Sequence, residues 1–352
     1  MSSNDEILFE RLGAAGIVTL NRPKALNAVT HGMARALRVE LDRWARDPAI
    51  TRVIIMAAGE RAFSAGGDIR ALYDLGRAGR TDDALEFWRD EYPLNLTIKN
   101  YRKPYIALID GIAMGGGIGV SVHGSHRIAG DRFSFAMPEV GIGFFPDVGA
   151  TWFLPRMPGE LGAYCALTGD RFGVTDAVSS GVATHRIPSE QFDAVLDGLT
   201  GTLSVDAALA AFARPAEQGP ITQRRSAIER LFAADRVEDI LDALDSEGRS
   251  PSTDAEWAQK TAATIRTKSP LSLKIALAQV RRGKHWDFET CMRAEFRIVS
   301  RIVEGHDFYE GVRAVIVDKD NKPRWQPARL ADVGDADVER HFAPLEAELV
   351  LP

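Results

Sequence analysis

A glycine triplet and two acidic residues are the features of this 352-residue chain whose types and spacing favour chemistry. The glycines at 115–117 follow the apolar run 105–109, so we expect a strand that breaks at the glycines and restarts as a helix. The first N–H groups of such a helix have no partner within it, and the helix dipole favours negative charge there. The triplet therefore predicts an oxyanion hole. A tight packing turn or a phosphate loop is the alternative, although neither GxGxxG nor GxxxxGK(S/T) occurs here.

The two acids, Glu139 and Asp147, follow in the apolar and glycine-rich segment MPEVGIGFFPDVG. A lone Glu is more often a solvated surface charge, but this segment offers little polar surface around Glu139. A carboxyl group in apolar surroundings has a raised pKa, which makes it a candidate for acid–base catalysis. Glu139 is accordingly the first candidate for a catalytic acid or base.

A second glycine turn has the same arrangement as the first. Residues 63–68 come directly after the apolar run 52–57, and Gly66 and Gly67 stand before an expected helix. Two such turns side by side can each offer one N–H to a single oxygen, which favours an oxyanion hole over two unrelated turns. Asp68 falls in the first turn of the helix, where an acid is more often a cap than a catalyst.

Composition restricts the class of protein. The formal net charge is −6 and 45% of the residues are hydrophobic, which argues for a globular protein without a general nucleic-acid partner. No apolar run is long enough to span a bilayer, so we expect no membrane partner. The first residues are polar and acidic, which favours the cytoplasm. Cys165 and Cys291 are expected to be buried in a reducing compartment, and no Cys/His spacing indicates a metal site.

The apolar patterns predict an α/β fold with parallel strand pairs. Runs at 7–12 and 17–20 read as a hairpin, Thr30 as the N-cap of a helix, and 52–57 as a buried strand. The order strand, helix, strand then predicts a parallel crossover. An amphipathic segment at 82–100 contains Pro93, which we expect to kink or split a helix.

Strand signals end near Pro188. We therefore expect two regions, a core at 1–188 that holds the active site and a helical C-terminal region at 189–352. The helical patterns of the second region predict one layer folded over the mouth of the first.

Three segments resemble the crotonase (enoyl-CoA hydratase/isomerase) superfamily: FSAGGDI at 63–69, GIAMGGG at 111–117 and MPEVGIGFFPDVGA at 137–150. The resemblance runs from about residue 7 to residue 333. The Glu139/Asp147 pair and the segment 305–325 are closer to the hydrolase branch of that superfamily. This resemblance implies a spiral of strand–strand–helix turns followed by an α-helical C-terminal region. It also implies hydrolysis of 3-hydroxyisobutyryl-CoA, and of 3-hydroxypropionyl-CoA as a second substrate, in valine catabolism.

The resemblance also implies roles for individual residues. The positions that match the oxyanion donors are Ala65 and Gly116. Glu139 would act as general base or nucleophile, and Asp147 would hold the substrate hydroxyl or orient water. The residues expected to contact the substrate are Glu91, Gly67, Asp68, Gly115, Lys24 and Ala25. Coenzyme A arrives as part of the acyl-CoA substrate, so we expect no metal and no cofactor, and superfamily members suggest a trimer-type homo-oligomer.

Two other functions stay open at this point. An enoyl-CoA hydratase or isomerase of this superfamily would carry a second Glu two residues after the triplet, but this chain has Gly119 there. A non-catalytic CoA-binding homologue would be favoured by loss of Glu139 or of a glycine turn, and all are present. His31, His123, His126 and His185 lie near the core motifs, but a Ser/His mechanism is disfavoured because no Ser stands in a GxSxG elbow. We expect structural roles for His123 and His126.

Overall fold

The first strands form the predicted hairpin at one edge of a six-stranded sheet. The structure is a computed structural model, and it describes residues 5–352. β1 (Ile7–Leu12) pairs antiparallel with β2 (Ala15–Leu20), and β2 pairs in parallel with β3 (Arg52–Ala57). Helix α1 (His31–Arg46) makes the crossover between β2 and β3, and the Thr30 hydroxyl accepts a hydrogen bond from the Met33 amide as the predicted N-cap.

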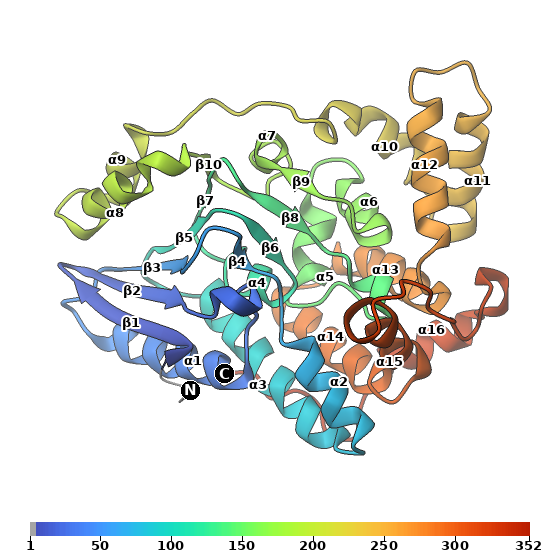
Figure 1. Cartoon of the computed structure of the whole chain (residues 1–352), viewed down its shortest axis with the longest axis horizontal. Coiled ribbons are helices and arrows are strands. Elements are labelled where there is room, and N and C mark those ends of the chain that lie inside the picture. Colours follow the sequence, from blue (N-terminus) through green and yellow to red (C-terminus); the bar gives the residue numbers. More distant parts are fainter. Residues whose placement is uncertain (1–4) are drawn as a thin grey trace.

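Two sheets lie side by side, and the chain spirals so that it adds strands to both of them in alternation (Figure 1). The first has the order β1-β2-β3-β5-β7-β10, and the second has the order β4-β6-β8-β9. Each successive turn gives one strand to each sheet, and most neighbours are parallel. The strands beyond β3 are β4 (Ala62–Ser64), β5 (Tyr105–Ile109), β6 (Ile112–Met114), β7 (His126–Ala129), β8 (Ser134–Ala136), β9 (Phe172–Gly173) and β10 (His185–Arg186). This architecture confirms the predicted α/β crotonase-like spiral.

Helix α3 (Thr81–Lys99) crosses the molecule between the sheets and the C-terminal helices (Figure 1). It runs through Pro93 without interruption, so Pro93 does not split it. Proline removes one backbone hydrogen bond. The segment around it is buried on nearly all sides, and that packing offsets the loss. The other helices of the core are α2 (Ile69–Arg77), α4 (Gly116–Gly119), α5 (Ala150–Phe153), α6 (Leu161–Thr168) and α7 (Val174–Ala177).

After β10, the described part of the chain contains helices but no further strand. These helices do not form one layer, so that prediction is wrong. α8 and α9 pack on the outer face of the six-stranded sheet, α11 and α12 pair as a hairpin at the far end, and α13 and α14 pack against α6 and α3 (Figure 1). The core has several separate apolar surfaces, and different helices pack on each of them. Their bounds are α8 (Phe192–Thr200), α9 (Val205–Ala210), α10 (Arg225–Leu231), α11 (Val237–Gly248), α12 (Ala255–Arg266), α13 (Pro270–Gly283), α14 (Phe288–Ile302), α15 (His306–Val312) and α16 (Asp335–Phe342).

The division into a core at 1–188 and a second region at 189–352 stays a prediction.

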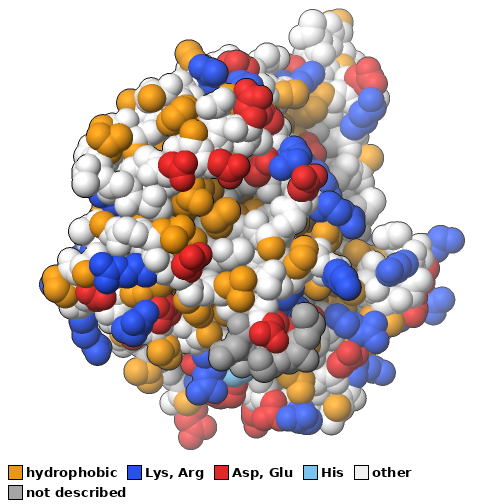
Figure 2. Space-filling view, turned by 60° about the vertical axis from the view of Figure 1, so that its left-hand side comes forward, with side chains coloured by type: hydrophobic (Ala, Val, Ile, Leu, Met, Phe, Trp, Pro, Cys, Tyr) orange, Lys and Arg blue, Asp and Glu red, His pale blue; other side chains and the backbone are white. Residues whose placement is uncertain are grey.

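Within the described residues, no helix has the length and apolar character that a membrane span requires. On the face shown in Figure 2, acidic and basic side chains are interspersed with apolar ones rather than gathered into one field.

Candidate active site

One cavity of about 620 Å³ collects the residues that the sequence singled out. Its walls come from both glycine turns, from α3, from the 3-10 turn Glu139–Ile142 and from the C-terminal π-helical turn Arg313–Val317. The volume is in the range of small-molecule sites in proteins. The predicted site residues that line it are Ala25, Ala65, Gly67, Asp68, Glu91, Gly115, Gly116, Glu139 and Asp147.

The two glycine turns meet at this cavity. Gly115 has φ +44°, a conformation that favours glycine, and it places the start of α4 at the cavity wall. A β-carbon built on Gly116 would lie 3.1 Å from the Gly67 amide nitrogen and 2.7 Å from Glu91 Oε1. The backbones of Gly67 and Gly116 are therefore neighbours, and only glycine at 116 keeps the space between them open.

The donor pair of this hole differs from the expected one. The Ala65 amide donates a 2.9 Å hydrogen bond to the Leu26 carbonyl, so it is not available to a ligand. The amides of Gly67 and Gly116 have no acceptor among residues 5–352. We therefore correct the predicted donor pair from Ala65 and Gly116 to Gly67 and Gly116. Motif spacing located the turn, but the hydrogen bond that ties Ala65 to residue 26 has no signal in the local sequence.

Glu139 begins the 3-10 turn Glu139–Ile142 after β8, and its side chain is buried in the cavity wall with 7% exposure. Its Oε2 atom has no hydrogen-bond partner in the part of the chain that the structure describes. Burial, and next the negative charge of Asp147, raise the pKa of Glu139 well above its ordinary value. A buried carboxylate with a free oxygen and a raised pKa is suited to accept a proton at neutral pH.

Asp147 also lines the cavity and is 5% exposed. The Tyr92 hydroxyl donates a hydrogen bond of 3.0 Å to Asp147 Oδ2. Burial raises the pKa of Asp147 to about 7, and the hydrogen bond from Tyr92 opposes that rise. Asp147 is therefore poised between its protonated and ionised forms near neutral pH.

Glu91 adds a third buried carboxyl group, from the middle of α3. Its Oε1 atom, close to Gly116, has no hydrogen-bond partner within the described residues. Burial and the charges of Asp147 and Glu295 raise the pKa of Glu91 well above its ordinary value. The cavity thus brings together the three acids that the sequence predicted, next to two available amides.

The family model described as enoyl-CoA hydratase/isomerase matches residues 15–342. The chain belongs to the enoyl-CoA hydratase/isomerase family. A mitochondrial 3-hydroxyisobutyryl-CoA hydrolase of Danio rerio is 44% identical over 98% of this chain and 91% of its own length. The protein of the same name from Rattus norvegicus is 43% identical, over 97% and 89%.

Solved structures of this family have the same fold. A structure titled carnitinyl-CoA dehydratase, from Mycobacterium thermoresistibile, is similar with a TM-score of 0.93 and 42% identity, and the match covers 99% of each chain. An enoyl-CoA hydratase from Rhodobacter sphaeroides gives a TM-score of 0.91 and 35% identity, over 98% of this chain and 100% of that one.

This chain has Gly119 at the position where a hydratase of the family is expected to carry its second catalytic Glu. A β-carbon built on Gly119 would lie 2.8 Å from Asn95 Nδ2 and 2.8 Å from Val148 Cβ. Such contacts are closer than packed side chains adopt, so a Glu cannot enter here without displacing both neighbours. The close packing of Asn95 and Val148 around position 119, next to Asp147, therefore excludes the second Glu of the hydratase pattern.

Glu295, on α14, is a positioning residue that does not itself line the cavity, and the sequence did not indicate it. It is fully buried, and its two carboxylate oxygens accept hydrogen bonds of 2.8 Å from the amides of Gly149 and Thr151. These bonds fix the segment directly after Asp147. Burial and then Asp147 raise the pKa of Glu295 to about 8, against the effect of the two amides. An acid on the apolar stripe of α14 is the signal that could have identified it.

Two residues that were predicted to contact the substrate, Asp68 and Lys24, lie in different surroundings from those expected. Asp68 is the N-cap of α2 and pairs with Arg22 at 3.0 Å, which gives it a structural role at the cavity edge. Lys24 is exposed in the 3-10 turn Pro23–Ala25 and does not line the cavity, whereas Ala25 does.

The C-terminal region contributes residues that no motif indicated. Lys268, Val315 and Ile316 line the cavity, so a part of that region does reach the mouth as predicted.

Two aromatic residues of the core form an apolar part of the cavity wall: Trp88 and Phe144 stack with ring centroids 5.8 Å apart. None of the candidate histidines is among the described residues that line it, and no cluster of possible metal ligands occurs in residues 5–352.

Proposed function

We propose that this chain is an acyl-CoA thioester hydrolase that converts 3-hydroxyisobutyryl-CoA to 3-hydroxyisobutyrate and coenzyme A. The observation that carries this proposal is the placement of a single unpartnered carboxylate oxygen of Glu139 in the same cavity as the Gly67 and Gly116 amides. The names of the relatives support the same substrate. Such a substrate belongs to valine catabolism, and 3-hydroxypropionyl-CoA is the second substrate we propose.

The glycine turns supply the electrostatic part of the reaction. Attack on a thioester carbonyl places negative charge on its oxygen, and two fixed N–H donors stabilise that charge. The amides of Gly67 and Gly116 are held by the fold before substrate binds, so they need no reorganisation during the reaction. Loss of one such donor typically costs about 3 kcal/mol in the barrier.

Glu139 supplies the proton transfer or the nucleophile. As general base, it takes a proton from water while the water oxygen bonds to the carbonyl carbon, and the tetrahedral intermediate then expels the coenzyme A thiolate, which receives that proton. As nucleophile, its oxygen bonds to the carbonyl carbon, the thiolate leaves, and water hydrolyses the resulting anhydride. A single turnover in ¹⁸O-water distinguishes them, because the anhydride route can place ¹⁸O in the Glu139 carboxyl group.

Asp147 and Glu91 act on the polar end of the acyl group. An ionised Asp147 can accept a hydrogen bond from the substrate hydroxyl or orient the attacking water, and Tyr92 holds the carboxylate in place. Glu91 offers a further acceptor beside Gly116. A buried hydrogen-bonding group of this kind discriminates strongly against substrates without the hydroxyl.

Coenzyme A is the remaining part of the substrate, and we propose no separate cofactor or metal. Lys24 and Ala25 would meet it at the mouth, and Lys268, whose pKa is lowered by burial, adds a cation there. A trimer-type assembly and a cytoplasmic location stay predictions. The relatives are named mitochondrial, so fractionation of the source cells is the direct measurement of location.

Purified protein with 3-hydroxyisobutyryl-CoA and a thiol reagent tests the proposal. Stoichiometric release of free coenzyme A supports hydrolysis. An absorbance change at the enoyl group of an enoyl-CoA, without release of thiol, would support the hydratase alternative. Binding of acyl-CoA with neither reaction would support a non-catalytic CoA-binding protein.

A further inference from the structure

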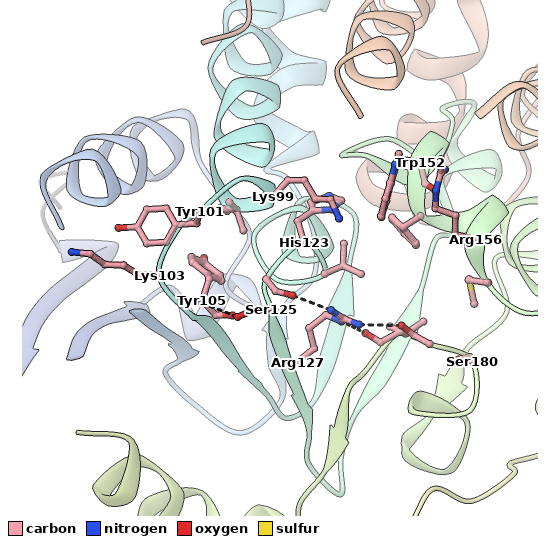
Figure 3. A pocket seen from close by; sticks show the side chains of 17 residues that line it. Lys99, Tyr101, Lys103, Tyr105, His123, Ser125, Arg127, Trp152, Arg156 and Ser180 are labelled. Atoms are coloured by element: carbon pink, nitrogen blue, oxygen red, sulfur yellow. Dashed lines mark hydrogen bonds between the residues drawn. The ribbon is translucent and has the colours of Figure 1, made fainter. Parts of the chain in front are cut away.

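A second cavity, of about 380 Å³, shares no lining residue with the active-site cavity. It is lined by the end of α3, the starts of β5 and β7, the turn after α4, the segment from α5 to Met157 and residues 180–182 (Figure 3). Its size is sufficient for a small polar ligand with bound water.

Cationic side chains dominate this second cavity. Lys99, Lys103, Arg127 and Arg156 line it, and no Asp or Glu does so within the described residues (Figure 3). Lys99 Nζ lies 3.6 Å above the ring centre of Trp152, and the Arg156 guanidinium lies 4.4 Å from the same centre. Burial and the neighbouring Arg127 and Arg156 lower the pKa of Lys99. An anion between these groups would relieve their mutual repulsion.

Lys99 is the cation whose hydrogen bonds are available. Its Nζ has no hydrogen-bond acceptor and no ionic partner among residues 5–352. Each of the other three donates to backbone carbonyls: Lys103 to Trp44 and Asp47, Arg127 to Gly124, Gly181 and Val182, and Arg156 to Trp152, Gly283 and Trp286. The two arginines retain unused N–H groups, because a guanidinium carries five donors.

His123 adds no charge to this cavity. Its side chain lines the second cavity with only 6% exposure, and its Nε2 atom lies 2.7 Å from the Val148 carbonyl oxygen. Nε2 therefore carries the proton and donates, since a carbonyl can only accept. Burial lowers the pKa of His123 to about 3, so the ring is neutral. Nδ1 has no hydrogen-bond partner within the described residues and is closed to solvent, so the ligand contacts are left to the cations.

We propose that the second cavity binds a small tetrahedral oxyanion, of the phosphate or sulfate class. The anionic oxygens accept hydrogen bonds from Lys99 and from the unused N–H groups of the two arginines. This site is independent of the proposed hydrolase activity.

Isothermal titration of the whole protein with inorganic phosphate tests the proposal, with chloride at equal ionic strength as the control anion. We expect one phosphate per chain and at least about tenfold weaker binding of chloride, which has no separate oxygens to accept from the three cations. Phosphate should also raise the melting temperature, since a ligand of the folded state stabilises it. An absence of phosphate binding at tens of millimolar would overturn the site, and so would equal binding of chloride, which would mark a nonspecific response to charge.

Two variants make the test specific. Lys99→Met keeps an unbranched side chain over Trp152 and removes the charge, so phosphate affinity should fall by about tenfold or more. Lys260→Met is the control, because it removes one charge from an exposed ion pair with Glu256 elsewhere on the surface. Unaltered phosphate affinity in Lys99→Met, with its melting temperature retained, would contradict the proposal. The phosphate and chloride comparison on the unmodified chain decides it even if that variant does not fold.

Discussion

The Tyr92 hydroxyl donates a 3.0 Å hydrogen bond to Asp147 Oδ2, and neither side chain is exposed to bulk solvent. This bond favours the ionised form of Asp147 and so holds its pKa near 7 against burial. Tyr92→Phe removes the donor and keeps the ring. The pKa of Asp147 should then rise, and a larger fraction of Asp147 should be protonated at pH 7.

The expected result for Tyr92→Phe is a kcat/KM for 3-hydroxyisobutyryl-CoA about tenfold lower at pH 7, with recovery toward pH 9. A pH profile of kcat/KM measures both. Tyr164→Phe is the matched control, since it also removes a tyrosine–aspartate hydrogen bond, to Asp170, away from the cavity. An equal loss at every pH would show that Tyr92 acts only through packing.

Glu139→Gln should reduce kcat by about a thousandfold or more and leave the melting temperature nearly unchanged. The amide has the shape of the carboxyl group, but it can neither accept the proton from water nor form an anhydride. Steady-state thiol release together with thermal unfolding measures the two effects. Glu289→Gln, at an exposed position on α14, controls for the lost charge. Full activity in Glu139→Gln would remove this residue from the mechanism.

Asp147→Asn should shift the acidic limb of the kcat/KM profile to lower pH. The charge of Asp147 raises the pKa of Glu139, so its removal lowers that pKa and keeps Glu139 ionised in more acidic solution. We also expect about tenfold lower selectivity for 3-hydroxyacyl-CoA over the acyl-CoA without the hydroxyl. Kinetics identical to those of the unmodified chain would assign Asp147 a structural role.

Gly116→Ala should lower kcat by about a hundredfold. The new β-carbon would stand 2.7 Å from Glu91 Oε1 and 3.1 Å from the Gly67 nitrogen, which fills the place of the substrate oxygen and disturbs both donors. Gly173→Ala is the control, because a β-carbon there meets no atom within 4 Å. Similar losses in the two variants would indicate a general effect on folding instead of a specific effect on the hole.

The sequence predicted those parts of the fold and site that depend on local pattern. The hairpin, the Thr30 cap and the buried strand at 52–57 follow from alternation, capping residues and apolar runs. The two glycine turns and the Glu139/Asp147 pair were found from residue types and spacing, whereas Glu91 and the individual roles came from the family resemblance. β7 and β8 were missed because strands of four and three residues are too short to show a period.

What the sequence missed depends on contacts between distant residues. Ala65 was expected to offer its amide to substrate, but the fold brings the Leu26 carbonyl to it. Glu295 stands 148 positions after Asp147, yet it holds the amides that follow Asp147. The C-terminal helices have clear amphipathic patterns, but these patterns do not specify which face of the core each helix covers.

Glu295→Gln should flatten the dependence of stability on pH. The pKa of Glu295 is raised by burial to about 8 in the folded chain, above its value when unfolded, so the folded state binds a proton more strongly. This stabilisation is present below the unfolded pKa and is lost as pH rises toward 8. The free energy of unfolding should fall by up to about 1.4 kcal/mol per pH unit from this group, and Gln cannot titrate.

Urea unfolding of the unmodified chain and Glu295→Gln between pH 5 and pH 8 measures this difference. At pH 5 the variant should be less stable by about 1–3 kcal/mol, because the single oxygen of Gln serves only one of the Gly149 and Thr151 amides. Toward pH 8 the two curves should converge. Glu289→Gln on the same helix is the control for the lost charge, at a position where the side chain is half exposed. Parallel curves for Glu295→Gln and the unmodified chain would mean that Glu295 keeps the same ionisation state throughout this range, bound to both amides as a carboxylate.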